Sequence, residues 1–263
     1  MTGRSRKPAP SGPRRTAPAP PGPRRAGAEP AAILYGRNPV HEALRAGRRR
    51  IETVWATERA AREPWLREIP AVQIVSADEL MRRCGSPDHQ GICAEAGGYP
   101  YVGAAELLSG PDPFIVALDE LQDPQNLGAI CRTAECAGAT GVVLCERRAA
   151  AVTPAAAKAS AGAVEHLRIA RVRNLADFLA DAKAVGCWCY GADGASPTTY
   201  DTPDYSGGVV LVLGGEGSGL RPRVAQACDA LISLPRRGRV QSLNASAAAA
   251  VLMYAIVQGR PIA

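Results

Sequence analysis

Three short polar segments of this chain have residue types and spacings suited to holding a nucleotide-like ligand. The first, residues 214–220, reads Gly-Gly-Glu-Gly-Ser-Gly-Leu and follows the apolar run Val209–Leu213. Its glycines would let the backbone approach a ligand closely. It is neither a Walker A loop nor a dinucleotide-binding fingerprint, because Leu220 stands where these need lysine and glycine respectively. The run is therefore a ligand loop of another kind, or a tight turn without a ligand.

The second segment, Asp123–Glu135, opens a helical pattern shortly after the apolar run that ends at Leu118. We predict that Asn126 caps this helix, which would leave outward-pointing N–H groups that attract an anion. Arg132 and Glu135 are three residues apart and fall on one face of the helix. They could contact a ligand together, or form an ordinary exposed ion pair.

The third segment, residues 234–246, reads Leu-Pro-Arg-Arg-Gly-Arg-Val-Gln-Ser-Leu-Asn-Ala-Ser. It joins the end of an apolar run to a long alanine-rich helix, for which Ser242 or Asn244 is the predicted N-cap. The basic side chains in this loop could bind RNA phosphates or simply be solvated; they are Arg236, Arg237 and Arg239.

The elements that must position these segments alternate between apolar strands and helices. Such strands, apolar on both faces, indicate a parallel sheet covered by helices on both sides. Ligands of these sheets bind beyond the carboxyl ends of the strands. We expect strands at Phe114–Leu118, Gly141–Leu144, Cys187–Tyr190, Val209–Leu213 and Ala230–Leu234, and helices near 127–137, 175–184 and 245–257.

Residues 31–98 are expected to form a smaller α/β domain, separated by a linker at 99–113 from the larger domain at 114–263. Asn38 is a predicted N-cap followed by Pro39, and Gly47 is expected to end that helix. Further strands are expected at Ile51–Ala56, Val72–Val75 and Ile92–Ala96, with helices at Arg59–Leu66 and Ala77–Arg83.

Composition limits the classes of protein to which the chain can belong. Residues 1–30 hold seven basic residues and one acid, which accounts for the whole net charge of +6. We expect this tail to be disordered, either as a tether for RNA phosphates or as a solubilising extension. The eight cysteines are scattered without a CxxC, so no metal site is expected. No apolar run is long enough to span a membrane or to form a secretory signal, which favours the cytoplasm.

Taken in order, the three segments resemble the SpoU/TrmH family of RNA ribose methyltransferases, within the SPOUT superfamily. Asn126 to Glu135 match the family motif N-x-G-x-x-x-R-[ST]-A-[DE], and residues 214–220 match G-x-E-x-x-G-[LM]. The third motif, I-P-M-x-G-x-x-x-S-L-N-[VA]-S, is matched at Pro235, Gly238, Ser242, Leu243, Asn244 and Ser246. Leu234 replaces isoleucine and Arg236 replaces methionine.

The smaller domain adds to this resemblance. Tyr35-Gly36-x-Asn38-x-Val40-x-Glu42-Ala43-Leu44 and His89-Gln90-Gly91-Ile92 are similar to the substrate-binding domain of the family, which is related to ribosomal proteins of the L30e type. The resemblance implies an L30e-like domain followed by a trefoil-knot domain, and it covers the chain from about Ile33 onward.

For the cofactor, the resemblance implies S-adenosyl-L-methionine. The residues expected to hold it, largely through backbone atoms, are Gly214, Gly215, Glu216, Leu234, Leu243 and Asn244. The catalytic set that it implies is Arg132, Asn126, Glu216, Ser242 and Asn244. A guanidinium stays protonated under ordinary conditions, so we expect Arg132 to clamp a phosphate and the developing oxyanion instead of acting as a base.

The resemblance also implies an RNA partner and a homodimer, with the last helix, Asn244–Gln258, as a candidate interface. Expected RNA contacts are Arg37, His89, Gln90, Arg236, Arg237 and Arg239. A guanosine of large-subunit ribosomal RNA is the favoured target, and transfer RNA is the alternative. A non-catalytic RNA-binding protein on the same scaffold is the competing interpretation, against which the intact motifs argue. A nucleotide-dependent oxidoreductase or ATPase is disfavoured by Leu220.

Overall fold

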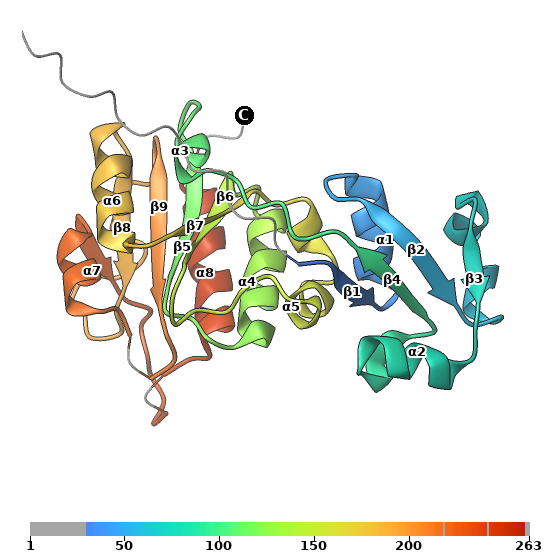
Figure 1. Ribbon diagram of the computed structural model, residues 1–263. Coiled ribbons are helices and arrows are strands. Elements are labelled where there is room, and N and C mark those ends of the chain that lie inside the picture. The colour runs from blue at the N-terminus through green and yellow to red at the C-terminus, as the bar shows by residue number, and fades with distance from the viewer. Residues whose placement is uncertain (1–29, 218, 241, 261–263) are drawn as a thin grey trace, which may run out of the picture.

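The computed structural model describes residues 30–217, 219–240 and 242–260, which form two α/β bodies side by side (Figure 1). The expectation for the basic tail concerns residues 1–30 and so lies, apart from Pro30, outside the described residues. Each body has its own sheet, of four strands in the first and six in the second. The four-stranded sheet lies in the N-terminal part of the chain and the six-stranded sheet in the C-terminal part.

The first body has strand order β1-β4-β2-β3. Strand β4 (Ile92–Ala96) pairs antiparallel with β1 (Ala32–Tyr35) and β2 (Ile51–Ala56), and β3 (Val72–Ile74) runs parallel to β2. Helix α2 (Ala77–Cys84) follows β3. These elements confirm the predicted strands and the second helix, whereas β1 was not predicted.

Two local predictions in this body are wrong. The segment 59–66 is not an α-helix but two short 3-10 helices, η1 (Ala60–Arg62) and η2 (Pro64–Glu68), since Pro64 lacks the N–H that would continue the first turn. Asn38 does not cap helix α1 (Arg37–Ala46), which starts two residues earlier than predicted, with Gly36 at φ 96° as its N-cap. Gly47, at φ 59°, ends this helix as predicted.

The second body is a six-stranded sheet in the order β10-β8-β9-β5-β6-β7, and every neighbouring pair is parallel. The pattern of apolar runs therefore gave the correct sheet type, although β7 was not predicted. The strands are β5 (Phe114–Asp119), β6 (Gly141–Cys145), β7 (Ile169–Val172), β8 (Trp188–Ala192), β9 (Val209–Gly214) and β10 (Ala230–Ile232).

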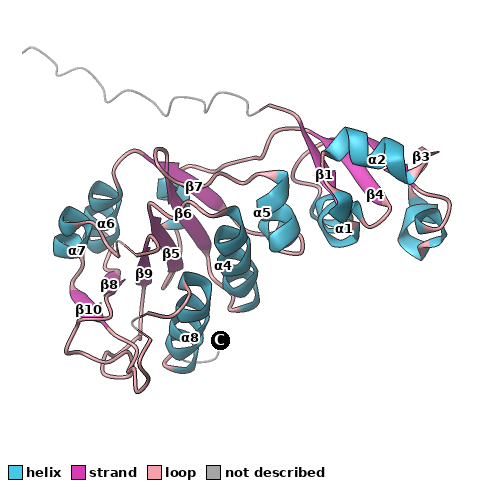
Figure 2. Cartoon of the chain, turned by 90° about the horizontal axis from the view of Figure 1, so that it is seen from below, coloured by secondary structure: helices cyan, strands magenta, loops and turns pink. Residues whose placement is uncertain are grey.

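Helices cover both faces of this sheet, as Figure 2 shows. Helices α4 (Pro124–Cys136), α5 (Pro154–Ala159) and α8 (Ala245–Gln258) pack on one face, and α6 (Leu175–Ala184) and α7 (Pro222–Ala227) on the other. Every residue of β5 is buried, because its side chains point alternately into the two layers. The central strands are thus rigid supports for the loops at their ends.

Helix α4 approaches α5 at a glycine. A Cβ on Gly128 would lie 2.6 Å from the Ala156 carbonyl oxygen and 2.8 Å from the Ser160 nitrogen, and it would collide with the Ala159 side chain. No larger residue fits without moving backbone. The glycine of the first sequence motif is therefore a packing residue that brings two backbones together.

The expected linker, 99–113, packs against the second body. It contains α3 (Ala104–Leu107), whose Leu107 is fully buried, and the Val102 N–H donates to the Ile169 carbonyl at 2.9 Å. The buried Tyr99 hydroxyl donates to the Val164 carbonyl at 2.7 Å. This segment therefore fastens the two bodies to each other.

A buried ion pair lies at the junction of the two bodies. Arg49, which follows β1 and α1, donates from Nε to Glu165 Oε2 at 3.0 Å, and a second bond joins its Nη2 to Oε1. Both side chains are almost fully buried. Burial raises the pKa of Glu165, and the Arg49 guanidinium opposes that rise. Nearby, Glu42 Oε2 lies 2.8 Å from His166 Nε2.

We predict that Arg49→Ala lowers the free energy of unfolding by about 3–5 kcal/mol, because it leaves the Glu165 carboxylate buried without its partner. The double variant Arg49→Met/Glu165→Leu should recover most of this loss, since it removes both charges and keeps the volume. Urea denaturation at neutral pH measures both changes. A double variant as unstable as Arg49→Ala would contradict the assignment.

Candidate functional site

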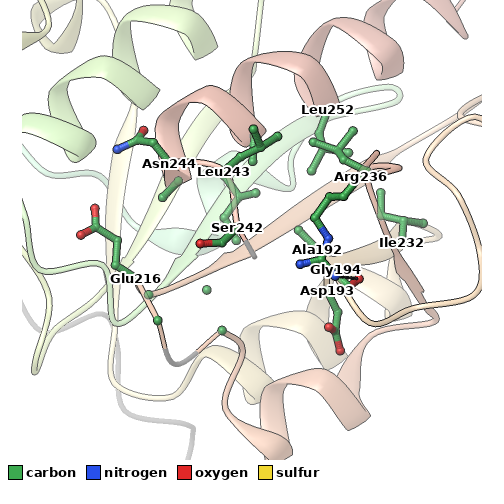
Figure 3. Close-up of a pocket in the computed structure, with 18 residues that line it drawn as sticks. Ala192, Asp193, Gly194, Glu216, Ile232, Arg236, Ser242, Leu243, Asn244 and Leu252 are labelled. Carbon is green, nitrogen blue, oxygen red and sulfur yellow. Dashed lines mark hydrogen bonds between the residues drawn. The ribbon is translucent and has the colours of Figure 1, made fainter. Parts of the chain in front are cut away.

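A pocket of about 450 Å³ opens at the carboxyl edge of the six-stranded sheet (Figure 3). Its walls are the loops after β8, β9 and β10 and the first turns of α8. This is where parallel sheets bind their ligands, and the volume suits a nucleoside-sized molecule. All residues expected to bind the cofactor line it, together with Ser242: Gly214, Gly215, Glu216, Leu234, Leu243 and Asn244.

The glycine-rich loop crosses over its own start. A Cβ on Gly214 would collide with the backbone of Gly219 and with the Leu220 nitrogen. The Gly219 N–H donates to the Gly215 carbonyl at 3.1 Å, and Gly219 has a φ of 64°, which favours glycine. The glycines therefore form a tight turn against the sheet, from which Glu216 projects.

Both ends of this loop are fixed to β5. Its first residue, Gly214, is paired with Asp119, the last residue of β5. The buried Asp119 carboxylate then accepts hydrogen bonds from the backbone N–H of Arg221 at 2.9 Å and from its Nε at 2.8 Å. Sequence reasoning missed this pair, whose signal was a carboxylate at the end of an apolar strand. The Asp119–Arg221 pair therefore fixes the end of the glycine-rich loop relative to strand β5.

A chain of hydrogen bonds joins the three sequence motifs. Asn126 is buried, and its Nδ2 donates to Glu216 Oε1. Asn126 Oδ1 accepts from Asn244 Nδ2 at 3.0 Å. Asn244 Oδ1 in turn accepts from the backbone N–H groups of Ser246, at 2.8 Å, and Ala247, at 3.3 Å. The Asn126 amide is thus oriented at both of its ends and links the loop after β9 to the start of α8.

The structure gives different outcomes for the two N-cap predictions: the one for α4 is wrong, and one of the two candidates for α8 is confirmed. Asn126 does not cap α4, because it is the third residue of that helix; the N-cap is Asp123, which accepts from the N–H groups of Gln125 and Asn126. For α8 the two candidates are separated, since Asn244 is the cap and Ser242 lies exposed at the pocket. The buried Asn126 side chain is therefore available for the pocket instead of for its own helix.

Arg132 does not line this pocket. Six residues beyond Asn126, it lies about 9 Å further along α4 and on a different side of the helix. There, with Glu135, it lines a second pocket of about 430 Å³. Residues of α1 and of the 160–166 segment form the rest of that pocket, including Glu42 and His166. Within one chain, the structure brings the predicted cofactor residues together and leaves Arg132 apart.

The proposed RNA contacts fall into two separate groups. In the first body, the Arg37 guanidinium pairs with Glu63 at 2.6 Å, and the Arg37 N–H donates to Gln90 Oε1 at 3.1 Å. His89 Nδ1 accepts from the Gly91 N–H at 2.9 Å. Arg37, His89 and Gln90 are therefore engaged in local contacts. The second group, Arg236, Arg237 and Arg239, is exposed in the loop after β10.

A lysine that sequence reasoning missed lies at the junction of the bodies. Lys158 of α5 packs against Gly36, where a Cβ would lie 2.5 Å from Nζ. Burial lowers the pKa of Lys158, and the nearby Asp88 opposes this change. Lys158 thus places a positive charge beside Gln90, and no sequence motif had indicated it.

In the described part of the chain, no cluster of three or more His, Cys, Asp or Glu side chains could hold a metal ion. All eight cysteines are free, and burial raises the pKa of several thiols, that of Cys131 to about 12. None of the described helices is both long and apolar enough to cross a membrane.

A parallel α/β sheet with a nucleoside-sized pocket at its carboxyl edge is the arrangement found in proteins that bind nucleotide-like ligands. The chain belongs to the SpoU rRNA Methylase family, whose profile matches residues 113–254; the profile for RNA 2′-O ribose methyltransferase substrate binding matches residues 33–102. It is accordingly an S-adenosylmethionine-dependent RNA 2′-O-methyltransferase with the SPOUT fold.

Relatives and solved structures agree with this assignment. YacO of Bacillus subtilis (strain 168), assigned to the TrmH family of tRNA/rRNA methyltransferases, is 38% identical over 237 residues, which are 86% of this chain and 94% of that protein. The AdoMet-bound rRNA methyltransferase of Sinorhizobium meliloti has a TM-score of 0.74 at 28% identity and 87% coverage of both chains. The SpoU methyltransferase AviRb of Streptomyces viridochromogenes, in complex with AdoMet, has a TM-score of 0.73 at 25% identity, covering 86% of this chain and 89% of its own.

The residues of the pocket fit this cofactor. Glu216 places a carboxylate at the pocket, where it can face the positive groups of S-adenosylmethionine, the sulfonium and the ammonium. Leu234 and Leu243 add apolar side chains to the pocket wall, and Leu243 is 54% exposed. The glycine turn offers backbone groups without side chains in the way.

The hydrogen bond from the Asn126 amide to the Glu216 carboxylate has a direction, donor to acceptor, that substitutions can test. Asn126→Asp would replace the donor with a second carboxylate and cost about 1–2 kcal/mol of stability at pH 7. A proton shared by two carboxylates binds more tightly in the folded protein, so the pKa of the pair rises and the deficit should shrink as the pH falls towards about 4.5.

Urea denaturation at pH 7.5 and pH 5 measures this effect. The matched double variant Asn126→Asp/Glu216→Gln restores a donor opposite an acceptor and should recover most of the loss at pH 7.5. A deficit that is the same at both pH values, and that the second substitution leaves unchanged, would disprove the direct bond.

Proposed function

We propose that this enzyme methylates the ribose 2′-hydroxyl of a guanosine in large-subunit ribosomal RNA, in the cytoplasm. The observation that supports methyl transfer at this site is the linked set Glu216–Asn126–Asn244 at the cofactor pocket, and the choice of ribosomal RNA is supported by the comparisons. The family is described as rRNA methylases, and a solved structure with 28% identity is an rRNA methyltransferase. Curated relatives are named tRNA/rRNA methyltransferases, so transfer RNA is the second candidate.

In this proposal, residues 31–98 bind RNA, residues 99–113 link the domains and residues 114–263 carry the chemistry. The bound cofactor supplies an activated methyl group on its sulfonium. Gly214, Gly215, Leu234 and Leu243 hold the cofactor, and Asn126, Glu216, Ser242 and Asn244 shape the place where the ribose enters. Since the donor is already activated, the chain must mainly position the hydroxyl and stabilise the oxygen as its proton leaves.

Arg132 is the proposed clamp for an RNA phosphate and for the developing oxyanion. Its exposed guanidinium lines the pocket between α1 and α4, where RNA held by the first body would pass. Guanidinium groups bind phosphate through paired N–H donors and keep their charge while doing so. Arg37, His89, Gln90, Arg237 and Arg239 are proposed as further RNA contacts.

We also propose a homodimer, because Arg132 and the cofactor pocket of one chain are separate. A second copy could bring its Arg132 to this pocket. Helix α8 offers a suitable surface: Val251 and Tyr254 are each 46% exposed and lie one turn apart, beyond the first turn of the helix that borders the pocket. Exposed apolar stripes of this kind are typical of subunit interfaces.

Arg132→Ala should lower methyl transfer to RNA at least 100-fold, since it removes a charged group that acts at the transition state. The Kd for S-adenosylmethionine should change less than twofold, because Arg132 of the same chain does not line the cofactor pocket and the Arg132 that a second copy would bring there is proposed to contact the phosphate and the ribose oxygen. The assay measures labelled methyl transfer to unmodified large-subunit rRNA and to tRNA, followed by digestion to nucleosides.

Label in 2′-O-methylguanosine from rRNA supports the proposal, and label confined to tRNA overturns the choice of substrate. Bound cofactor without label in either RNA would contradict naked RNA as the acceptor and indicate a ribosomal particle. An absence of cofactor binding would favour a non-catalytic RNA-binding protein.

Val251→Glu/Tyr254→Glu should convert the dimer to a monomer, because it places four charges in an apolar contact. Light scattering at micromolar concentration measures the mass. Val185→Glu is the matched control, since Val185 is an exposed apolar residue at the end of α6, on the opposite face of the sheet. A wild-type monomer, or a double variant that stays dimeric, would contradict this interface.

A further inference from the structure

Arg236 is the residue at which this chain departs most clearly from its family motif, where methionine is usual. The structure shows a specific contact for it. Its side chain extends over the rim of the cofactor pocket towards the loop after β8, as Figure 3 shows. There Nη2 donates to the Gly194 carbonyl oxygen at 3.0 Å. A methionine thioether has no donor and could not make this bond.

The loop that carries Gly194 is held in place by further hydrogen bonds. The preceding residue, Asp193, donates its N–H to the Ile232 carbonyl at 2.9 Å, and its Oδ1 accepts from the Ala195 N–H at 2.9 Å. A Cβ on Gly194 would lie 3.6 Å from Arg236 Cζ, so the guanidinium packs directly against the bare Cα. The carbonyl that accepts from Arg236 therefore belongs to a loop fixed by its own hydrogen bonds.

The Arg236 end belongs to a more exposed segment. Every described residue from Pro235 to Leu243 is exposed to solvent. This segment nevertheless supplies Ser242 and Leu243 to the wall of the pocket. A tie between Arg236 and Gly194 thus joins an exposed wall of the pocket to a fixed one.

We propose that Arg236 is a positioning residue that latches the segment 235–243 to the loop after β8, across the rim of the cofactor pocket, and thereby tightens cofactor binding. This contact acts on cofactor binding even when no RNA is bound. It holds Leu243 and Ser242 in place for the cofactor, which then loses less conformational freedom from the loop when it binds. Arg236 is in this respect distinct from its neighbour Arg237, which does not line the pocket.

The alternative use of Arg236 is a phosphate contact with RNA, and the two uses predict different measurements. A bond to a backbone carbonyl affects cofactor affinity in the absence of RNA. A phosphate contact affects RNA affinity and its dependence on salt, through release of counterions. Cofactor binding without RNA therefore isolates the latch from the choice of RNA substrate.

The experiment uses the full chain and titration calorimetry without RNA, with S-adenosylmethionine and S-adenosylhomocysteine as the two probes. Arg236→Met should raise both Kd values by roughly three- to tenfold, the size of one lost hydrogen bond from a charged donor at an exposed rim. Arg236→Lys, which keeps a donor on a flexible stem, should fall between. Arg237→Met removes a charge from the same loop and should change Kd by less than twofold.

Kinetics provide the second readout. Arg236→Met should raise the KM for S-adenosylmethionine while kcat at saturating cofactor stays within twofold, a split that general destabilisation would not give. Arg236→Gln, which is too short to reach Gly194, guards against a folding defect peculiar to methionine and should behave as Arg236→Met does. Unchanged Kd values in both variants, with weaker RNA binding and a shallower salt dependence, would overturn the latch in favour of a phosphate contact.

Discussion

The position of the side-chain amide of Asn126 fixes the arrangement of the loops that form the pocket of this enzyme. An amide offers a donor on one side and an acceptor on the other, and both are used: Nδ2 donates to Glu216 and Oδ1 accepts from Asn244. Because Asn126 is buried within α4, these two partners are held to a rigid helix instead of to each other. The segment of Asn126 is 90 positions from Glu216 and 118 from Asn244, and the three segments nevertheless keep one fixed arrangement.

The loops themselves are held by contacts of very different kinds. The glycine turn is closed by backbone crossing at Gly214 and by the buried carboxylate of Asp119. Among the described residues of the loop after β10, the exposed Arg236 reaches over the pocket rim to the Gly194 carbonyl. The first wall of the pocket is thus built of buried backbone and carboxylate contacts, whereas the described residues of the second are exposed to solvent.

Much of this architecture could be predicted from the sequence, and the exceptions have physical reasons. Apolar runs such as Val209–Leu213 gave the parallel sheet, because strands buried on both faces leave no other pattern. Strand β7 was missed, since Arg171 interrupts its apolar run. The helix expected at 59–66 fails at Pro64. These are cases in which local chemistry or an edge position overrides periodicity.

The candidate site could be predicted as a list of residues but not as an arrangement. Asn126 was expected to cap its helix, and a short polar side chain near a helix start carries that signal whatever it does. Only the folded chain shows that Asp123 takes this role and frees Asn126 for the pocket. The pairing of Asp119 with Arg221, 102 positions apart in the chain, leaves no local signal either.

Gly128 lies where helix α4 packs on the segment that contacts the first body. At this glycine α4 meets the backbone of α5, and the chain that leaves α5 carries Glu165 and His166, which hold the first body through Arg49 and Glu42. Flexible side chains normally cushion such a contact, and here there is none. The helix that carries Asn126 is therefore in direct backbone contact with the segment that joins the two bodies. Helix α4 thus belongs both to the wall of the pocket and to the support of the first body.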